Sequence, residues 1–210
     1  MINIVMADDH AIVREGMKQI VSEEDDIKVV GEANDAEELF EVLRKVDCDI
    51  VILDLNMPGK TGLDALKDMK VEFPELPVLI LSMYDEDQYG IRSLKAGASG
   101  YLRKVSAPDD LVLAIRKIVS GGKYISPALA ESLANNIGSG KVMQPHEHLS
   151  DREYEVLCKI ASGKTADEIA HEISISIHTV YSYRNRIMDK MQLKSNVELT
   201  QYAIQNKLLD

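Results

Sequence analysis

Residues 50–59 read IVILDLNMPG, an unbroken apolar run that stops at Asp54 and passes into a turn containing Pro58 and Gly59. An apolar run that does not alternate with polar residues is typical of a strand covered on both faces. Comparable runs recur along the first half of the chain, with amphipathic segments between them, and this alternation predicts an α/β fold with a parallel sheet. The predicted strands cover residues 2–7, 27–30, 50–53, 77–81 and 101–102, and the predicted helices cover residues 11–22, 37–46, 63–71, 87–96 and 108–119.

Polar side chains stand where four of the predicted strands end. Asp8 and Asp9 follow the first strand, Asp54 ends the third, and Ser82 and Lys104 follow the fourth and fifth. Because parallel strands present their carboxyl ends at one edge of the sheet, we expect these side chains to meet there. Three neighbouring carboxylates repel one another unless a cation lies between them, and a site built of oxygen atoms suits Mg²⁺. An aspartate beside Mg²⁺ and an ammonium group is suited to accept a phosphoryl group.

These residues resemble those of a known family. The motifs that carry the resemblance are residues 8–9 (DD), residues 54–59 (DLNMPG), Ser82 and residues 97–104 (GASGYLRK). In order and spacing they resemble the receiver domain of bacterial two-component response regulators. The resemblance implies a flavodoxin-like (βα)5 domain, in which Asp54 is phosphorylated. It also implies that Mg²⁺ is held by Asp8, Asp9, Asp54 and the backbone carbonyl of Asn56.

The receiver resemblance also implies a switch. Ser82 and Tyr101 would form the pair that responds to phosphorylation, with Tyr101 swinging toward the sheet, and Lys104 would pair with the phosphoryl group. Ser82 stands where many relatives have threonine, and it keeps the hydroxyl group. Residues 54–59 also begin like an EF-hand calcium loop, but the twelfth position is Ala65 rather than glutamate, which excludes that site.

Charge is unevenly distributed along the chain. The 210 residues carry 24 Lys and Arg and 35 Asp and Glu, a formal charge of −11, of which residues 1–120 hold −10 and residues 121–210 hold −1. The total speaks against DNA binding, whereas residues 179–194 carry four bases and one acid, a local charge of +3 that suits DNA. The chain has neither the ~18–20 consecutive apolar residues of a membrane span nor a signal peptide, so we expect a cytoplasmic protein without a membrane partner.

The strand–helix pattern ends at a glycine pair, residues 121–122. A short helix is expected to open at residues 126–127, and residues 135–145 have the composition of a linker. No further strand is predicted, so the chain is expected to end in a second, smaller all-α domain. The predicted domains are residues 1–120, a linker with one short helix at residues 121–147, and residues 148–210.

The last 60 residues or so form the pattern of a helix-turn-helix domain. Ser150 with Glu153 and Thr165 with Glu168 have capping-box spacing and predict two helix starts. Residues 149–153, Gly163, residues 168–170 and residues 179–180 resemble the LuxR-type DNA-binding domain. A receiver followed by this domain resembles the NarL/FixJ-type response regulators, and residues 179–187 and 197–199 look closest to the GacA/UvrY subgroup. The last helices are predicted at about residues 165–173, 177–191 and 197–207.

At about 100° per residue, the helix at residues 177–191 has two different sides. Val180 and Ile187 lie on the core side, and the opposite side is expected to enter the major groove of DNA, where Asn185 can read adenine. Arg184 falls near the core side and is expected to pair with a nearby acid. The predicted DNA contacts are Tyr181, Ser182 and Asn185 on base edges, Lys164, Thr179 and Arg186 on phosphates, and Thr165, His178 and Lys190 alongside them.

Together these features predict a transcription regulator in which a sensor histidine kinase phosphorylates Asp54. Its predicted partners are promoter DNA, the kinase and, when phosphorylated, a second copy of the chain. We do not expect an enzyme, beyond slow self-phosphorylation and self-dephosphorylation. Two alternatives stay open. Asn56 and the lack of a further base at the site count against a Mg²⁺-dependent phosphohydrolase, and the intact acidic triad counts against a DNA binder that ignores phosphorylation.

Overall fold

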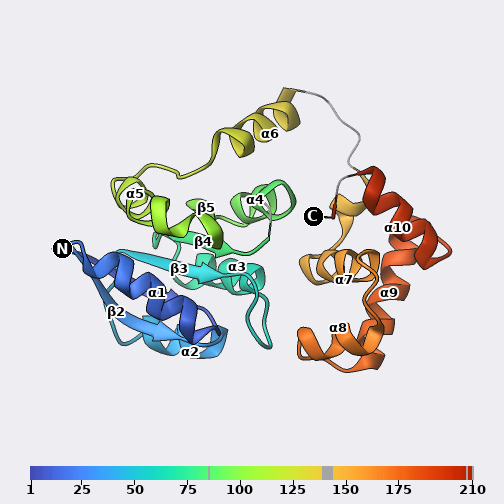
Figure 1. Ribbon diagram of the computed structural model, residues 1–210, viewed down its shortest axis with the longest axis horizontal. Helices are drawn as coiled ribbons and strands as arrows, with labels where there is room; N and C mark the ends of the chain where they lie inside the picture. The colour runs from blue at the N-terminus through green and yellow to red at the C-terminus, as the bar shows by residue number, and fades with distance from the viewer. Residues whose placement is uncertain (85, 139–143, 207, 210) are drawn as a thin grey trace. The chain divides into compact units, whose positions relative to one another are not determined.

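The computed structural model describes residues 1–84, 86–138, 144–206 and 208–209 and separates into two compact units, Met1–Ser139 and Gly140–Asp210. The first unit alternates strands with helices, as predicted (Figure 1). Its strands are β1 (Ile2–Ala7), β2 (Ile27–Ala33), β3 (Ile50–Asp54), β4 (Val78–Ser82) and β5 (Gly100–Arg103). Its helices are α1 (Ala11–Ser22), α2 (Ala36–Leu43), α3 (Gly62–Glu72), α4 (Glu86–Lys95), the short 3-10 helix η1 (Lys104–Ser106), α5 (Ala107–Val119) and α6 (Pro127–Gly138).

The five strands form one parallel sheet in the order β2-β1-β3-β4-β5. Every residue of β3 and β4 is buried, which confirms that these apolar runs are covered on both faces. The strand order reverses between β1 and β3, so the helices that follow these two strands lie on opposite faces. In sheets of this kind, ligands bind outside the carboxyl ends of the strands at this point of reversal.

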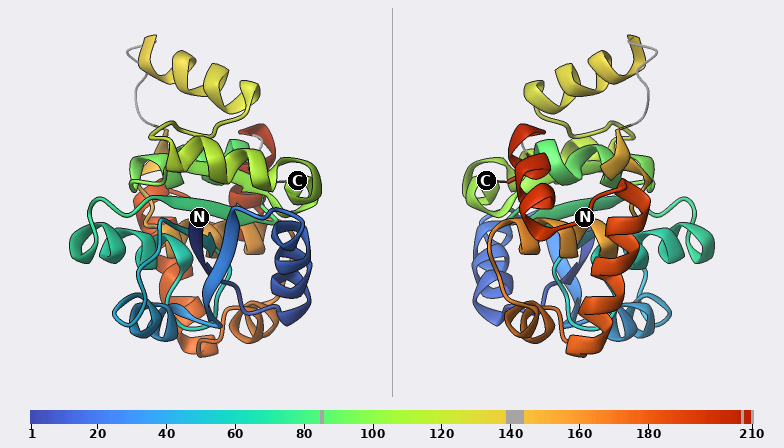
Figure 2. Two further views of the ribbon diagram at one scale, coloured as in Figure 1. Left: turned by 90° about the vertical axis from the view of Figure 1, so that its left-hand side faces the viewer. Right: turned by 90° about the vertical axis from the view of Figure 1, so that its right-hand side faces the viewer.

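Helices cover both faces of the sheet. Residues of α1 and α5, such as Met17 and Ile115, pack with Ile4 and Ile52 of the sheet in one buried cluster. Figure 2 shows α1 on one side of the sheet and α2 and α3 on the other. Each leucine or isoleucine removed from water in this way contributes about 1.5–3 kcal/mol, so the packing fixes where the ends of β1, β3 and β5 lie.

The segment after α5 runs along the edge of the sheet. The backbone N–H of Tyr101 donates to the carbonyl of Tyr124 at 3.1 Å, and the N–H of Tyr124 donates to the carbonyl of Ser99 at 3.0 Å. Tyr124 and Gly100 thereby form an isolated parallel bridge. Residues that the sequence assigns to the linker are therefore hydrogen-bonded directly to β5.

Helix α6 packs against α4. Its Leu129 is fully buried, and it fits above Gly90 of α4, where an added Cβ would lie 2.9 Å from the leucine methyl groups. Ser126 caps α6 by accepting the N–H of Leu129, and its hydroxyl donates to Glu86 of α4 at 2.5 Å. The helix predicted within the linker thus packs on the first unit, while residues 139–143 of that linker lie outside the described residues.

Among its described residues, the second unit has helices as its regular elements and no strand. Both predicted capping boxes are confirmed, because Ser150 and Thr165 each accept the N–H of a glutamate three residues on, and that glutamate accepts theirs in return. The turn between the two helices of the helix-turn-helix passes through Ser174, which has φ 53°. The elements are the 3-10 helix η2 (Pro145–His148), α7 (Asp151–Ala161), α8 (Ala166–Glu172), α9 (Ile177–Met191) and α10 (Asn196–Gln205).

Candidate functional site

The acidic residues predicted at the strand ends come together at the carboxyl ends of β1 and β3. The side chains of Asp8 and Asp54 are each 1% exposed, and Asp9 lies at the rim. Lys104 reaches in from the end of β5 and places its Nζ 2.7 Å from Asp8 Oδ2 and 2.7 Å from Asp54 Oδ2. Fifty residues of chain separate Lys104 from Asp54, so the sheet topology creates this contact.

Two buried carboxylates share one ammonium group at this site. Burial raises the pKa of Asp54 from its ordinary value of 3.8 to about 6, because Lys104 only partly offsets the loss of water and Asp8 adds repulsion. Burial would lower the pKa of Lys104, but Asp54 and Asp8 together raise it above its usual value. At neutral pH Asp54 is therefore ionised beside a charged lysine, and the site keeps an excess of negative charge.

The donor atoms of the acidic group fit a small divalent cation. Asp54 Oδ1 is buried and has no hydrogen-bond partner among the described residues. Asp8 Oδ2 contacts Lys104 at ion-pair distance, without the geometry of a hydrogen bond. One ligand atom from each of Asp8, Asp9, His10 and Asp54 can be chosen so that all lie within 4.8 Å of one another. Carboxylate oxygens in this arrangement suit Mg²⁺. Asn56 lies in the exposed turn after β3, and its backbone carbonyl remains a predicted ligand.

His10 also belongs to this group, although it was not among the residues predicted from the sequence. Its Nδ1 lies 2.7 Å from Asp9 Oδ1 and 3.1 Å from Asp8 Oδ1. Its backbone N–H also donates to Asp8 Oδ1 at 2.8 Å. The signal available in the sequence was its place directly after the Asp8-Asp9 pair.

The two predicted switch residues are both buried. Ser82 is fully buried and its Oγ accepts the N–H of Tyr84 at 3.2 Å. Tyr101 is 1% exposed, and its hydroxyl donates to the carbonyl of Tyr84 at 2.8 Å. We expected Tyr101 to swing toward the sheet upon phosphorylation, but in this structure it already points inward. The ring therefore already occupies the buried position that we expected it to reach upon phosphorylation.

In the second unit, α9 has one buried and one exposed side. Val180 and Ile187 are buried, as the helical period predicted, and Met191 is buried with them. Ser176 caps the helix by accepting the N–H of Thr179, and the Ser182 hydroxyl donates to the His178 carbonyl at 2.9 Å. The predicted DNA contacts that are exposed are His178, Tyr181, Ser182, Asn185, Arg186 and Lys190, whereas Thr179 is half-buried and Thr165 is the exposed N-cap of α8.

Two of the predicted DNA-contacting lysines are engaged in ion pairs. Lys164 pairs with Glu172, which also holds Lys159 at 2.9 Å. Lys190 donates to the buried Glu153 at 2.6 Å. These pairs leave both ammonium groups at the surface, where exchange of the carboxylate for a phosphate is possible.

The prediction that Arg184 pairs with an acidic residue is wrong. The Arg184 guanidinium donates to the side-chain carbonyl of Asn196 at 2.6 Å. The residue is half-buried, as its place near the core side suggested. An amide oxygen at the start of α10 therefore takes the place of the expected carboxylate.

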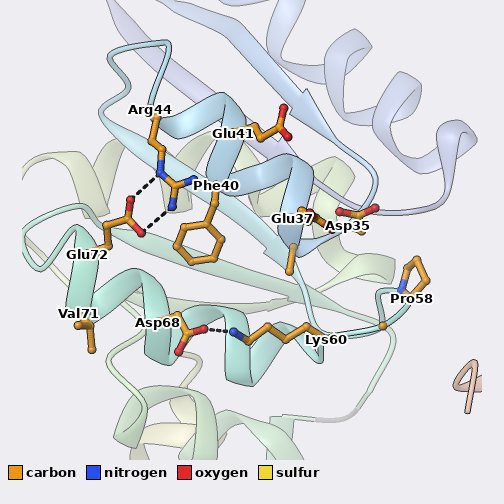
Figure 3. Close-up of a pocket in the computed structure, with 12 residues that line it drawn as sticks. Asp35, Glu37, Phe40, Glu41, Arg44, Pro58, Lys60, Asp68, Val71 and Glu72 are labelled. Carbon is orange, nitrogen blue, oxygen red and sulfur yellow. Dashed lines mark hydrogen bonds and ion pairs between the residues drawn. The ribbon is translucent and has the colours of Figure 1, made fainter.

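A cavity of about 870 Å³ lies elsewhere on the first unit, between α2 and α3. Figure 3 shows that its charged residues pair across it, with Arg44 on Glu72 at 2.8 Å and Lys60 on Asp68. None of the acidic strand-end residues lines it. Because the cations that line this cavity, Arg44 and Lys60, already have acidic partners, and because Asp8, Asp9 and Asp54 lie outside it, we place the chemistry at Asp54 and not in this cavity.

Comparisons with known proteins cover both units. The response regulator receiver domain matches residues 4–116, and the bacterial regulatory proteins of the luxR family match residues 147–203. The oxygen regulatory protein NreC of Staphylococcus carnosus is 40% identical over 99% of both chains, and that of Staphylococcus aureus strain JH9 is 38% identical over the same shares.

Solved structures are similar as well. RcsB of Salmonella enterica serovar Typhimurium, bound to the promoter rprA with the phosphomimetic BeF3−, aligns with a TM-score of 0.66 at 31% identity, covering 96% of this chain and 98% of that one. A structure of two RcsB dimers bound to two parallel DNAs aligns with a TM-score of 0.60 at 30% identity, covering 96% of each chain. The finer resemblance to the GacA/UvrY subgroup stays a prediction. Among the residues that the structure describes, no helix has the length and apolar character needed to cross a membrane.

Proposed function

Because the chain belongs to the bacterial response regulators in which a receiver domain precedes a LuxR-type DNA-binding domain, we propose that phosphorylation of Asp54 controls how α9 binds promoter DNA. The protein is a DNA-binding transcription regulator of a two-component system, and a sensor histidine kinase is its partner. The single observation that carries the assignment of Asp54 is its buried carboxylate, 2.7 Å from the Lys104 ammonium group at the carboxyl edge of the sheet.

The site supports transfer of a phosphoryl group to Asp54. With a pKa of about 6, the Asp54 carboxylate is ionised at neutral pH and can attack the phosphorus of a phosphohistidine. A new O–P bond forms as the P–N bond breaks, and the imidazole leaves with its electron pair. Mg²⁺, held by Asp8, Asp9, Asp54 and the Asn56 carbonyl, would neutralise the oxygens of the transferred group. Lys104 supplies a fixed positive charge for the same oxygens.

The added phosphoryl group changes the charge balance of the receiver. It brings about −1.5 to −2 charges to a site with one ammonium group. Lys104 then has a stronger partner than Asp8, and the Ser82 hydroxyl is the nearby donor that the family pattern assigns to a phosphoryl oxygen. β5 is hydrogen-bonded to Tyr124, and α6 packs on α4 through Leu129. A movement of β5 or of α4 would therefore also displace residues of the predicted linker.

We further propose residues 1–120 as the receiver, residues 121–147 as the linker and residues 148–210 as the DNA-binding domain. The protein works in the cytoplasm, forms a homodimer when phosphorylated, and has no enzymatic activity beyond slow self-phosphorylation and self-dephosphorylation. On DNA, Asn185, Ser182 and Tyr181 would read base edges, and Arg186 would bind phosphate. Lys164 would exchange Glu172 for a phosphate.

Labelling with a small radioactive phosphoryl donor, followed by gel-shift titration, tests this function. We expect the wild type and the exposed-loop control Asp47→Asn to be labelled, and Asp54→Asn to be unlabelled. Labelled protein should bind promoter DNA more tightly than unlabelled protein. Persistent labelling of Asp54→Asn would show that the acceptor is misassigned. Equal DNA binding with and without the phosphoryl group would favour a regulator that ignores phosphorylation.

A further inference from the structure

His10 extends the acidic site with a donor atom of a different chemical kind. The side chain of His10 is 56% exposed, yet its Nδ1 contacts both Asp9 Oδ1 and Asp8 Oδ1, at 2.7 and 3.1 Å. Nδ1 therefore faces the same carboxylates that are suited to hold a divalent cation. An imidazole nitrogen and three carboxylates offer one ligand atom each within a sphere small enough for a single ion.

The position of His10 in the helix does not account for this orientation. His10 occupies the N-cap position of α1, where polar side chains commonly accept an N–H of the first helical turn. Its side chain makes no such capping bond. The ring turns instead toward the acids that end β1, and the backbone N–H of His10 joins the same carboxylate by donating to Asp8 Oδ1.

One carboxylate oxygen in this acidic group accepts no hydrogen bond from the described residues. Asp54 Oδ1 is buried without a hydrogen-bond partner among the described residues, because Lys104 is bonded to the other oxygen, Oδ2. A buried carboxylate oxygen without a partner is costly unless a cation or a donor meets it. This second observation, independent of His10, indicates that a cation belongs at the centre of the group.

We propose that His10 is a metal ligand, and that this receiver binds divalent cations in a mixed nitrogen and oxygen site. This inference rests on the proposed function in one respect: both assign the same acidic residues to the metal site. Imidazole nitrogen suits first-row transition ions, whereas Mg²⁺ prefers oxygen donors. The site therefore binds Mn²⁺ and Co²⁺ through Nδ1 in addition to the carboxylates, and it favours Co²⁺ over Mg²⁺ more strongly than three carboxylates alone would.

The test uses the full chain at neutral pH, without a phosphoryl donor. Pulsed electron paramagnetic resonance of the bound Mn²⁺ should show hyperfine coupling to a directly bonded nitrogen in the wild type, and His10→Gln should lose it. His10→Gln should also lower the affinity for Co²⁺ about tenfold or more, in line with the loss of one metal-binding partner, and lower the affinity for Mg²⁺ less than about threefold. The control His171→Gln, a change of an exposed histidine on α8, should bind Mn²⁺, Co²⁺ and Mg²⁺ as the wild type does.

Two results would overturn the proposal. The first is an absence of nitrogen coupling in the wild type while Mn²⁺ is bound. The second is an equal loss of Co²⁺ and Mg²⁺ affinity in His10→Gln, which would make His10 a positioning residue that orients Asp8 and Asp9. The phosphorylation function is judged separately by the labelling of Asp54, so each proposal can fail while the other stands.

Discussion

Replacing Asp54 by asparagine should stabilise the folded receiver at neutral pH. The change preserves the shape of the side chain and removes one of two buried negative charges that share Lys104. The rise in the pKa of Asp54 from 3.8 to about 6 corresponds to about 3 kcal/mol, at about 1.4 kcal/mol for each tenfold change in proton affinity. Lys104 keeps Asp8 as its partner, so the variant leaves one charge of each sign. We expect the free energy of unfolding to rise by about 2–3 kcal/mol at pH 7.5.

The effect should depend on pH in a defined direction. Folding raises the pKa of Asp54, so the folded state binds this proton more tightly than the unfolded state does. The wild type therefore suffers no penalty from this carboxylate below its ordinary pKa of 3.8, and the full penalty above its folded-state value of about 6. The advantage of Asp54→Asn should appear between these values and level off above them.

Urea unfolding of the full chain, without divalent metal, provides the measurement. The methyl resonance of Ile52, which is buried in β3, reports the receiver transition separately from that of the second unit. Asp47→Asn serves as the control, because Asp47 is exposed in a loop and its change should alter stability by less than about 0.5 kcal/mol. An Asp54→Asn variant that is no more stable than the wild type at pH 7.5, or whose advantage is equally large near pH 4, would contradict the expected penalty from the buried carboxylate.

Further predictions concern the metal, the linker and the second unit. Saturating Mg²⁺ should raise the melting temperature of the wild-type receiver more than that of Asp54→Asn, because the variant lacks one carboxylate ligand; equal shifts in calorimetry would contradict this. Leu129→Ala should weaken the docking of α6 on α4 by about 2–4 kcal/mol, seen as faster amide exchange in α6 with unchanged exchange in β3. Ser150→Ala should remove a capping box and lower the stability of the second unit by about 1 kcal/mol, and an unchanged unfolding midpoint would exclude that role.

Much of the fold could be read from local patterns. The unbroken apolar runs predicted the doubly covered strands, and the acids and the lysine that end them predicted the residues that gather around Asp54. The capping boxes at Ser150 and Thr165 depend on spacing within one helical turn, so they could also be predicted. The buried side of α9 followed from the helical period alone. In each case the physical cause acts over a few residues, or follows from the direction in which parallel strands run.

Side-chain partners far apart in the chain could not be predicted in this way. Lys190 is held by Glu153 and Arg184 by Asn196, because the packing of α9 against its neighbours brings these groups together. The inward position of Tyr101 depends on the carbonyl of Tyr84, whose place is fixed by the turn after β4. Which of these contacts forms depends on the rotamers that satisfy the polar groups once the chain has folded.

The amino-acid sequence alone was enough to predict an α/β receiver and a helical DNA-binding domain, because hydrophobic periodicity and helix caps are local properties. It also determined which residues end the strands. It is the packing of the folded chain that makes Asp54 share a single ammonium group with Asp8 and that places α6 against α4. These features depend on distances between segments remote in sequence, and on the removal of water from between them. That removal of water raises the pKa of Asp54 and leaves its Oδ1 without a hydrogen-bond partner among the described residues.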